Sequence, residues 1–236
     1  MSAGEIDVVT GESNDEPRSE NPQAGGSAVK AYIQLLRLPA VFTALADIFL
    51  GYMLTHASVR DAPVSLGLLL ATSACLYLSG MVFNDLFDRR IDAIERPQRP
   101  IPSGRVSVRA ATILGTGLMA AGLGLAASLR WIDPLLCGWN PLVVATAIVA
   151  AIFLYNGMLK STPIGPLAMG ACRFLNVILG ASASGFLICK PFYNPQRWIA
   201  IGIAVYVAGV TWFSRSEATE SRRGSLLWGM CVVNVG

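Results

Sequence analysis

Long apolar segments separated by short polar ones dominate this chain. Six of them approach the length of a membrane span: Leu38–His56, Val64–Phe83, Ala110–Leu129, Pro141–Leu159, Ile164–Cys189 and Trp198–Phe213. A seventh begins near Leu226 and continues to the last residue, Gly236, so we expect the sequence to stop inside a helix. Because a helix needs about 20 apolar residues to cross a bilayer, the pattern predicts an all-α, polytopic transmembrane helix bundle with about seven helices in this chain.

The first residues differ from the rest. Met1 to Gly26 are polar and acidic, rich in Gly, Ser, Asn and Pro, and lack the apolar core of a signal peptide. We therefore predict a disordered tail over residues 1–28 and one transmembrane domain over residues 29–236, incomplete at its C-terminal end.

Composition supports a membrane protein. The 236 residues are 53% hydrophobic and 14% charged, with a mean hydropathy of +0.54, whereas soluble domains carry about 25% charged residues. His56 is the only histidine, and the five cysteines form no CxxC pair. A histidine-based metal centre and a Ser-His-Asp triad are thus excluded.

The basic residues predict the orientation. Thirteen of the 18 Lys and Arg residues fall on one side of the predicted spans and four on the other. Since cytoplasmic loops carry the excess of Lys and Arg, we expect the N-terminus and the loops around Arg90, Lys160 and Arg222 to be cytoplasmic. In a bacterium the membrane would be the inner one.

Oxygen-bearing side chains cluster directly after the second apolar segment. Asn84, Asp85, Asp88 and Asp92 fall within nine residues. On a helix, Asn84, Asp88 and Asp92 share one stripe, and such a group needs a cation among its oxygens. Mg²⁺ suits these ligands and usually shares such sites with substrate phosphates.

A stiff basic run follows, Arg96-Pro97-Gln98-Arg99-Pro100-Ile101-Pro102-Ser103-Gly104-Arg105. Prolines fix the backbone, and arginines held beside metal carboxylates suit a polyanion such as diphosphate. Arg96 and Arg99 are therefore candidate diphosphate ligands. The alternative is a solvated charged loop between two helices.

The string from Asn84 to Asp92, followed by Arg99-Pro100 and Pro102-Ser103-Gly104, resembles the first signature of the UbiA superfamily of intramembrane prenyltransferases. The resemblance implies a bundle of typically nine membrane helices with a cytoplasm-facing cavity for Mg²⁺ and a prenyl diphosphate. It implies metal ligands at Asn84, Asp88, Asp85 and Asp92, with Asn84 and Asp88 catalytic through that metal.

Some further residues resemble family residues, and others are polar side chains inside a span, which need a partner. Arg37 and the Tyr155–Lys160 pair resemble family residues beside the diphosphate, with Lys160 catalytic; the alternative is a set of interfacial anchors. Arg173 lies inside a span, where an arginine costs ~2.5–3.5 kcal/mol, and Asn176 shares its helical face. Arg173 either pairs with Asp47 or, with Asn176, binds substrate.

The second polar loop departs from the family. UbiA-type enzymes carry a second aspartate motif there, whereas this chain has Glu217 and Glu220 beside Arg215. The glutamates are candidate ligands of a second Mg²⁺ and Arg215 a candidate diphosphate ligand; the alternative is a solvated loop. The departure suggests a divergent branch, such as the EboC-like one.

The resemblance, together with the acidic stripe and its basic neighbours, implies an Mg²⁺-dependent prenyltransferase that moves an isoprenyl chain from a prenyl diphosphate to an unidentified small acceptor within the lipid bilayer. The alternative is a UbiA-like membrane protein that binds or transports an isoprenoid or lipid without transferase activity. A CDP-alcohol phosphotransferase is rejected because the Asp-Gly and Ala-Arg elements are absent around Asp85–Asp92. No basic-aromatic pattern suggests a nucleic-acid partner.

Overall fold

The computed structural model describes residues 23–132, 138–184 and 195–218, and within these ranges every regular element is a helix. The long helices are α1 (Gln23–Leu36), α2 (Val41–Met53), α3 (Pro63–Glu95), α4 (Val108–Ile132), α5 (Asn140–Leu154), α6 (Gly165–Ala181) and α7 (Pro195–Ala218). Three short turns, η1 (Leu38–Ala40), η2 (Tyr155–Leu159) and η3 (Ser182–Ser184), continue or join them. The all-α prediction is confirmed.

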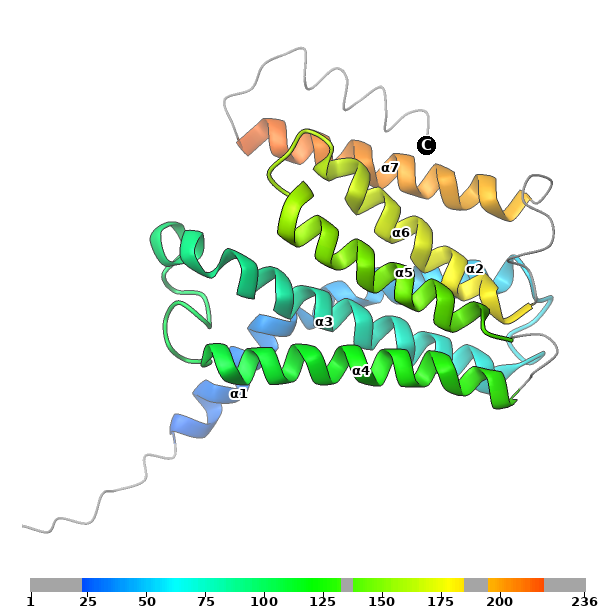
Figure 1. The fold of residues 1–236 in the computed structure, drawn as a ribbon, viewed down its shortest axis with the longest axis horizontal. Coiled ribbons are helices and arrows are strands. Elements are labelled where there is room, and N and C mark those ends of the chain that lie inside the picture. Colours follow the sequence, from blue (N-terminus) through cyan, green and yellow to red (C-terminus); the bar gives the residue numbers. More distant parts are fainter. Residues whose placement is uncertain (1–22, 133–137, 185–194, 219–236) are drawn as a thin grey trace, which may run out of the picture.

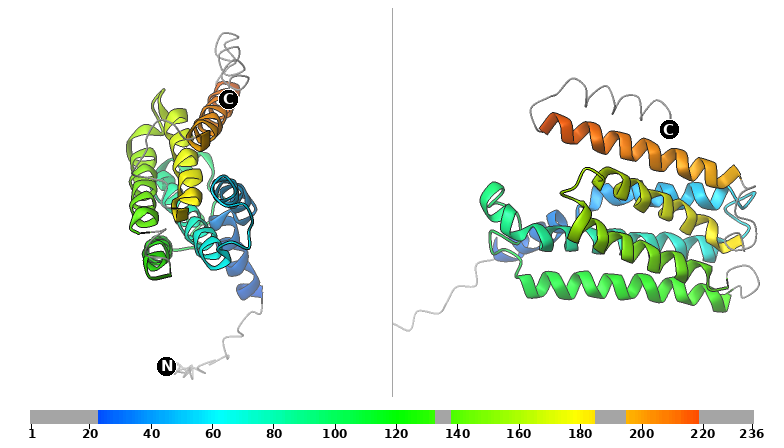
Figure 2. Two further views of the ribbon diagram at one scale, coloured as in Figure 1. Left: turned by 90° about the vertical axis from the view of Figure 1, so that its right-hand side faces the viewer. Right: turned by 45° about the horizontal axis from the view of Figure 1, so that its top comes forward.

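The helices α2 to α7 lie side by side and alternate in direction, with α3 in the middle (Figure 1; Figure 2). Helix α3 contacts α1, α2, α4, α5 and α6, while α7 packs against α6. The alternation brings the end of α3, the end of α5 and the start of α2 to one end of the bundle. Figure 1 shows the C-terminal end of α7 at that same end.

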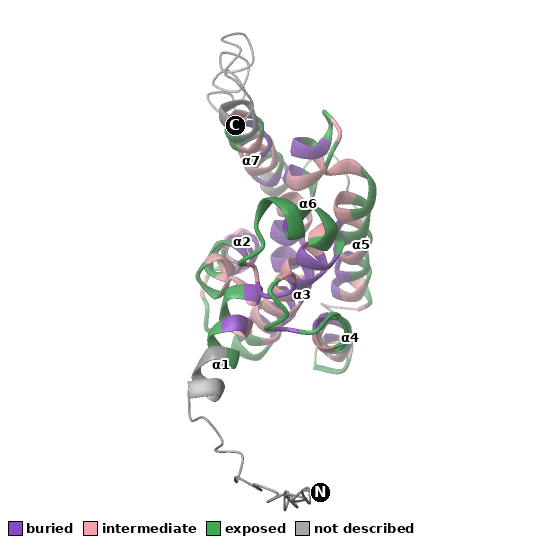
Figure 3. Ribbon diagram, turned by 90° about the vertical axis from the view of Figure 1, so that its left-hand side faces the viewer, coloured by how far each residue is buried: buried purple, intermediate pink, exposed green. Residues whose placement is uncertain are grey.

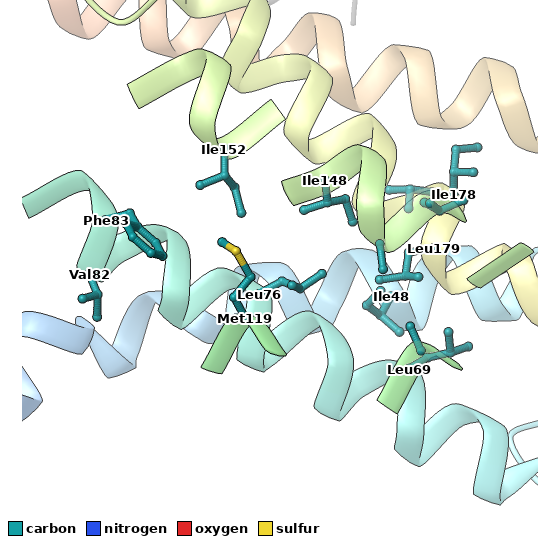
Figure 4. Packing of buried hydrophobic residues seen from close by; sticks show 14 of the residues in the cluster. Ile48, Leu69, Leu76, Val82, Phe83, Met119, Ile148, Ile152, Ile178 and Leu179 are labelled. Carbon is teal, nitrogen blue, oxygen red and sulfur yellow. The ribbon is translucent and has the colours of Figure 1, made fainter. Parts of the chain in front are cut away.

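Helix α3 is the axis of the core. Its 33 residues extend about 50 Å at 1.5 Å per residue, longer than the roughly 30 Å hydrocarbon core. Leu69, Leu76 and Val82 are almost fully buried along it. Buried residues lie on α3 and on the helices around it in Figure 3, and Figure 4 shows side chains of α3 meeting those of α2, α4, α5 and α6.

Two glycines allow α2 and α6 to approach closely. A Cβ at Gly51 of α2 would overlap the carbonyl oxygen of Val177, and one at Gly180 of α6 would overlap that of Ile48. Small residues commonly permit such backbone contact between membrane helices. The contact holds the polar side chains of α2 against those of α6.

All six apolar segments overlap described helices, and five of the described helices are long and apolar enough to cross a membrane by length and composition. The sixth, over Trp198–Ser214, is a shorter apolar helix. The seventh predicted segment, from Leu226, lies outside the described residues.

Three boundaries differ from the predictions. Helix α1 already begins at Gln23, inside the predicted tail, and the helical path breaks at Arg37. Helix α3 runs on through the acidic segment to Glu95. Helix α6 ends at Ala181 instead of Cys189, because the hydroxyls of Ser182 and Ser184 donate back to carbonyl oxygens in a 3₁₀ turn.

Candidate functional site

A cavity of about 330 Å³ lies between α3, α5 and α6, at the end of the bundle where the acidic segment lies. Predicted site residues in its wall are Arg37, Asn84, Asp88, Arg96, Arg99, Tyr155, Lys160, Arg173 and Asn176. The remaining wall includes Ala44, Ser73, Leu76, Tyr77, Gly80, Met81, Ile148, Ile152, Asn156, Met169 and Cys172. The structure thus brings together residues from the helices α2, α3, α5 and α6, the turn η2 and three connecting segments.

One face of α3 lines the cavity from its mouth to its interior. Ser73, Tyr77, Gly80, Asn84 and Asp88 all contribute to the wall, and their spacings of three and four residues place them on a single stripe. The stripe extends over the fifteen residue steps from Ser73 to Asp88, about 22 Å. The polar end at Asn84 and Asp88 is therefore continuous with a wall that reaches deep between the helices.

Lys160 faces the polar end of that stripe from across the cavity. Its Nζ donates to Oδ1 of Asn84 at 2.8 Å and also pairs with Oδ2 of Asp88. The turn η2 that precedes it is a π-helix, in which the backbone N–H of Lys160 donates to the carbonyl oxygen of Tyr155 at 2.8 Å. A π-turn takes one residue more than an α-turn, so residues five apart, Tyr155 and Lys160, both line the cavity.

The other two acids of the segment pair with arginines. Nη2 of Arg37 lies 2.7 Å from Oδ1 of Asp85, and Nη1 of Arg99 lies 2.6 Å from Oδ2 of Asp92 and 3.3 Å from Asp85. Both carboxylates are 5% exposed, and neither lines the cavity. Asp85 and Asp92 therefore hold two arginines at the cavity mouth.

Arg37 reaches Asp85 because the chain breaks there. It adopts a left-handed backbone (φ 50°, ψ 46°), the only described non-glycine residue with positive φ. Pro39 two residues later lacks the N–H that would continue the hydrogen bonding of α1. The break separates α1 from α2 and directs the Arg37 side chain to α3.

A second polar cluster lies deeper. Nη2 of Arg173 lies 2.9 Å from Oδ1 of Asp47, which is the ion pair considered as one of two alternatives for Arg173, and the guanidinium also donates to the Thr43 carbonyl oxygen at 3.0 Å. Asn176 accepts from Ser73 at 2.8 Å and donates to the Ala44 carbonyl oxygen at 2.7 Å. The cluster links α2, α3 and α6 and leaves Arg173 and Asn176 in the cavity wall.

The donor set at the mouth fits Mg²⁺ shared with a substrate. Asn84 and Asp88 offer neutral and charged oxygen ligands one helical turn apart on the cavity wall. In the described part of the chain no three acidic, histidine or cysteine side chains converge on one point. Mg²⁺ commonly binds one or two carboxylates and completes its shell with water and substrate phosphates, which this arrangement permits.

Not every predicted residue can be placed. The side chains of Arg215 and Glu217, at the end of α7, and all of Glu220 lie outside the described residues. The predicted stripe also has to be divided, because Asp92 faces Arg99 and does not line the cavity. Ser73 and Tyr77 were missed, although continuing the Asn84–Asp88 stripe backwards along the helix would have found both.

Asn156 was missed for a different reason. Its Nδ2 donates to the Ile152 carbonyl oxygen at 3.0 Å, while its Oδ1 is buried and has no hydrogen-bond partner in the described structure. It reaches the cavity wall next to Tyr155 within the π-turn. Sequence spacing alone does not reveal a π-turn.

Comparisons with known proteins agree with this geometry. Residues 44–226 match the UbiA prenyltransferase family. A digeranylgeranylglyceryl phosphate synthase from Metallosphaera sedula is 35% identical over 199 residues, 83% of this chain and 64% of the relative. The synthase from Methanopyrus kandleri is 33% identical over 136 residues, 58% of this chain and 46% of the relative. The chain thus spans about half to two thirds of the length of these curated relatives.

Solved structures share the fold. A digeranylgeranylglyceryl phosphate synthase superposes with a TM-score of 0.68 at 22% identity, covering 87% of this chain and 73% of that one. A UbiA homologue from Archaeoglobus fulgidus bound to GPP and Mg²⁺ gives 0.67 at 16% identity, with the same two coverages. The chain belongs to the UbiA prenyltransferase family and is an integral, multi-pass membrane protein.

Proposed function

We propose that the protein is a membrane-embedded, Mg²⁺-dependent prenyltransferase that moves an isoprenyl chain from a prenyl diphosphate to a small acceptor and releases diphosphate. One observation carries the proposal: Asn84 and Asp88 face Lys160 at the mouth of a cavity whose interior wall includes Leu76 and Ile152. Oxygen ligands opposite a cation suit a metal-bound diphosphate, and the apolar wall suits its isoprenoid tail. Family membership and the UbiA homologues bound to DMAPP or GPP with Mg²⁺ support it.

Different residues bind different parts of the donor. Asn84 and Asp88 would hold Mg²⁺, which when bound neutralises the charge that develops on the leaving diphosphate. Lys160, Arg96 and Arg99 line the same mouth and supply fixed positive charge to the phosphate oxygens. Asp85 and Asp92 act through Arg37 and Arg99, which they hold in place.

The chemistry follows from this placement. The bond between C1 of the prenyl group and the diphosphate oxygen breaks, and its electron pair leaves with the diphosphate. The apolar walls formed by Leu76, Ile148 and Ile152 keep water from the allylic cation. An acceptor oxygen then bonds to C1 and loses its proton to the released diphosphate, so no protein base is required.

We further propose an acceptor of the glycerol phosphate class. Relatives at 29–36% identity are digeranylgeranylglyceryl phosphate synthases, which suggests geranylgeranyl diphosphate as donor and geranylgeranylglyceryl phosphate as acceptor. Glu217, Glu220 and Arg215 would complete the mouth from the end of α7, as a second metal and diphosphate group. The charge asymmetry supports a cytoplasmic mouth and N-terminus.

The full-length protein in lipid nanodiscs tests the proposal. We expect Mg²⁺-dependent formation of prenylated lipid from labelled geranylgeranyl diphosphate and geranylgeranylglyceryl phosphate, with farnesyl diphosphate as a shorter donor for comparison. Mg²⁺-dependent donor binding without product from several acceptors would instead support the alternative, a binding or transport protein. Absence of both donor binding and product would contradict the proposal.

A further inference from the structure

The two sides of the cavity differ in chemistry. The wall from α5 carries Ile148 and Ile152, and Ile152 packs directly against Gly80 of α3. The wall from α6 carries Arg173 and Asn176 with their hydrogen-bonded partners. An isoprenoid chain suits the first side, whereas a polar group held at the second would find donors deep between the helices.

Arg173 is fixed and still has donors to offer. Its partner Asp47 is 5% exposed, whereas the Arg173 side chain is 21% exposed and lines the cavity. The bonds to Asp47 and Thr43 occupy both hydrogens of Nη2 and one of Nη1. Since a guanidinium has five N–H groups, Nε and one hydrogen of Nη1 have no partner among the described residues and remain for a ligand. Asp47 serves as the positioning residue.

Tyr77 lies at the same depth on the opposite helix. Helices α3 and α6 run antiparallel, and Ser73 meets Asn176 at 2.8 Å. One turn towards the mouth from that contact are Tyr77 on α3 and Arg173 on α6. Tyr77 lines the cavity, and its hydroxyl has no hydrogen-bond partner in the part of the chain that the structure describes. A tyrosine inside a helix bundle normally has one.

We propose that Tyr77 and Arg173 bind the anionic head group of the acceptor, a phosphate monoester, at a station separate from the donor diphosphate. The inference rests on the proposed function, because it assumes that the ligand is the second substrate. Asn84 and Tyr77 are seven residues apart on α3, about 10 Å along its axis. That spacing leaves room between the two anions for the allylic carbon and the glycerol unit. The station therefore selects phosphorylated over uncharged acceptors.

Equilibrium binding tests this without any turnover. Full-length protein in nanodiscs is titrated, in the absence of donor, with geranylgeranylglyceryl phosphate and separately with geranylgeranylglycerol, which lacks only the phosphate. Tyr77→Phe removes one hydroxyl and keeps the ring, while the double variant Asp47→Asn/Arg173→Gln removes the charge without leaving Asp47 unpaired. Tyr206→Phe, on the exposed face of α7, is the matched control.

We expect Tyr77→Phe to weaken binding of the phosphorylated lipid about tenfold or more, the effect of one hydrogen bond to a charged group. The double variant should remove the preference for phosphate, and binding of the uncharged lipid should not change. Donor affinity with Mg²⁺ should match the wild type, as it should for Tyr206→Phe.

The outcomes separate the two proposals. If Tyr77→Phe and the double variant bind the phosphorylated lipid as tightly as the wild type while the wild type forms product, the station is wrong and the prenyltransferase stands. If both variants lose the phosphate preference but the wild type forms no product, the station is a lipid-phosphate site and the prenyltransferase is wrong. Equal wild-type affinity for both lipids overturns the station outright.

Discussion

The two pairs of acidic-segment residues on α3 have the same chemistry but different surroundings. Asn84 and Asp88 face the cavity and Lys160, whereas Asp85 and Asp92 are buried against Arg37 and Arg99. Asp85 is turned about 100° from Asn84 around the helix, whereas Asp92 continues the Asn84–Asp88 spacing and is set apart by its pairing with Arg99. One pair is available to a ligand, and the other shapes the site by fixing cations, so substitutions in the two pairs should have different consequences.

The largest effect should follow removal of the cavity-facing carboxylate. We expect Asp88→Asn to lower turnover on the order of 10³-fold, because loss of a metal ligand forfeits several kcal/mol of charge stabilisation. The measurement is product formation over a range of Mg²⁺ concentrations. Wild-type turnover at the same Mg²⁺ concentration would show that Asp88 does not bind the metal.

Replacing Lys160 should have the second-largest effect on turnover. Lys160→Met keeps the length of the side chain and removes its charge, which we expect to cut turnover about 100-fold through the loss of one charge-assisted contact to diphosphate. Donor affinity, measured with Mg²⁺ present, should fall with it. Lys160→Arg serves as the control and should retain part of the activity; equal losses in both variants would indicate a need for shape instead of charge.

Replacing Asp92 should lower the stability of the fold more than it weakens metal binding. Asp92→Asn weakens the contact to Arg99, a buried carboxylate to a partly exposed guanidinium, and we expect about 2 kcal/mol of lost stability with a few-fold loss of turnover. Thermal unfolding and the Mg²⁺ dependence of activity measure the two effects. A large rise in the Mg²⁺ concentration needed for half-maximal activity would instead place Asp92 among the metal ligands.

Sequence reasoning predicted the helices well because hydrophobic length is a property of single segments. The segments Val64–Phe83 and Ala110–Leu129 lie inside α3 and α4. The division of the acidic segment could not be predicted, because it depends on where Arg37 and Arg99 arrive from other parts of the chain. Tyr77 belongs to no sequence motif. It is identified only by its helical spacing from Asn84 and by lying at the same depth in the bundle as Arg173. Whether the chain belongs to the EboC-like branch stays a prediction.

The smallest effect should come from the π-turn between α5 and α6, and it tests why Lys160 reaches Asn84. Deleting Met158, which is exposed, shortens the step from Tyr155 to Lys160 from five residues to four. Four residues complete an α-turn, so both side chains should still face the cavity. We expect turnover within a few-fold of the wild type.

Inserting one alanine after Met158 is the matched opposite change. It rotates Lys160 away from Asn84 and should reproduce the loss seen in Lys160→Met, as measured by turnover and donor affinity. If the deletion is as damaging as the insertion, the π-turn itself shapes the site. Asn156, whose buried Oδ1 has no partner among the residues that the structure describes, then becomes the residue to replace next. If neither change matters, the contact between Lys160 and the stripe on α3 is not part of the donor site.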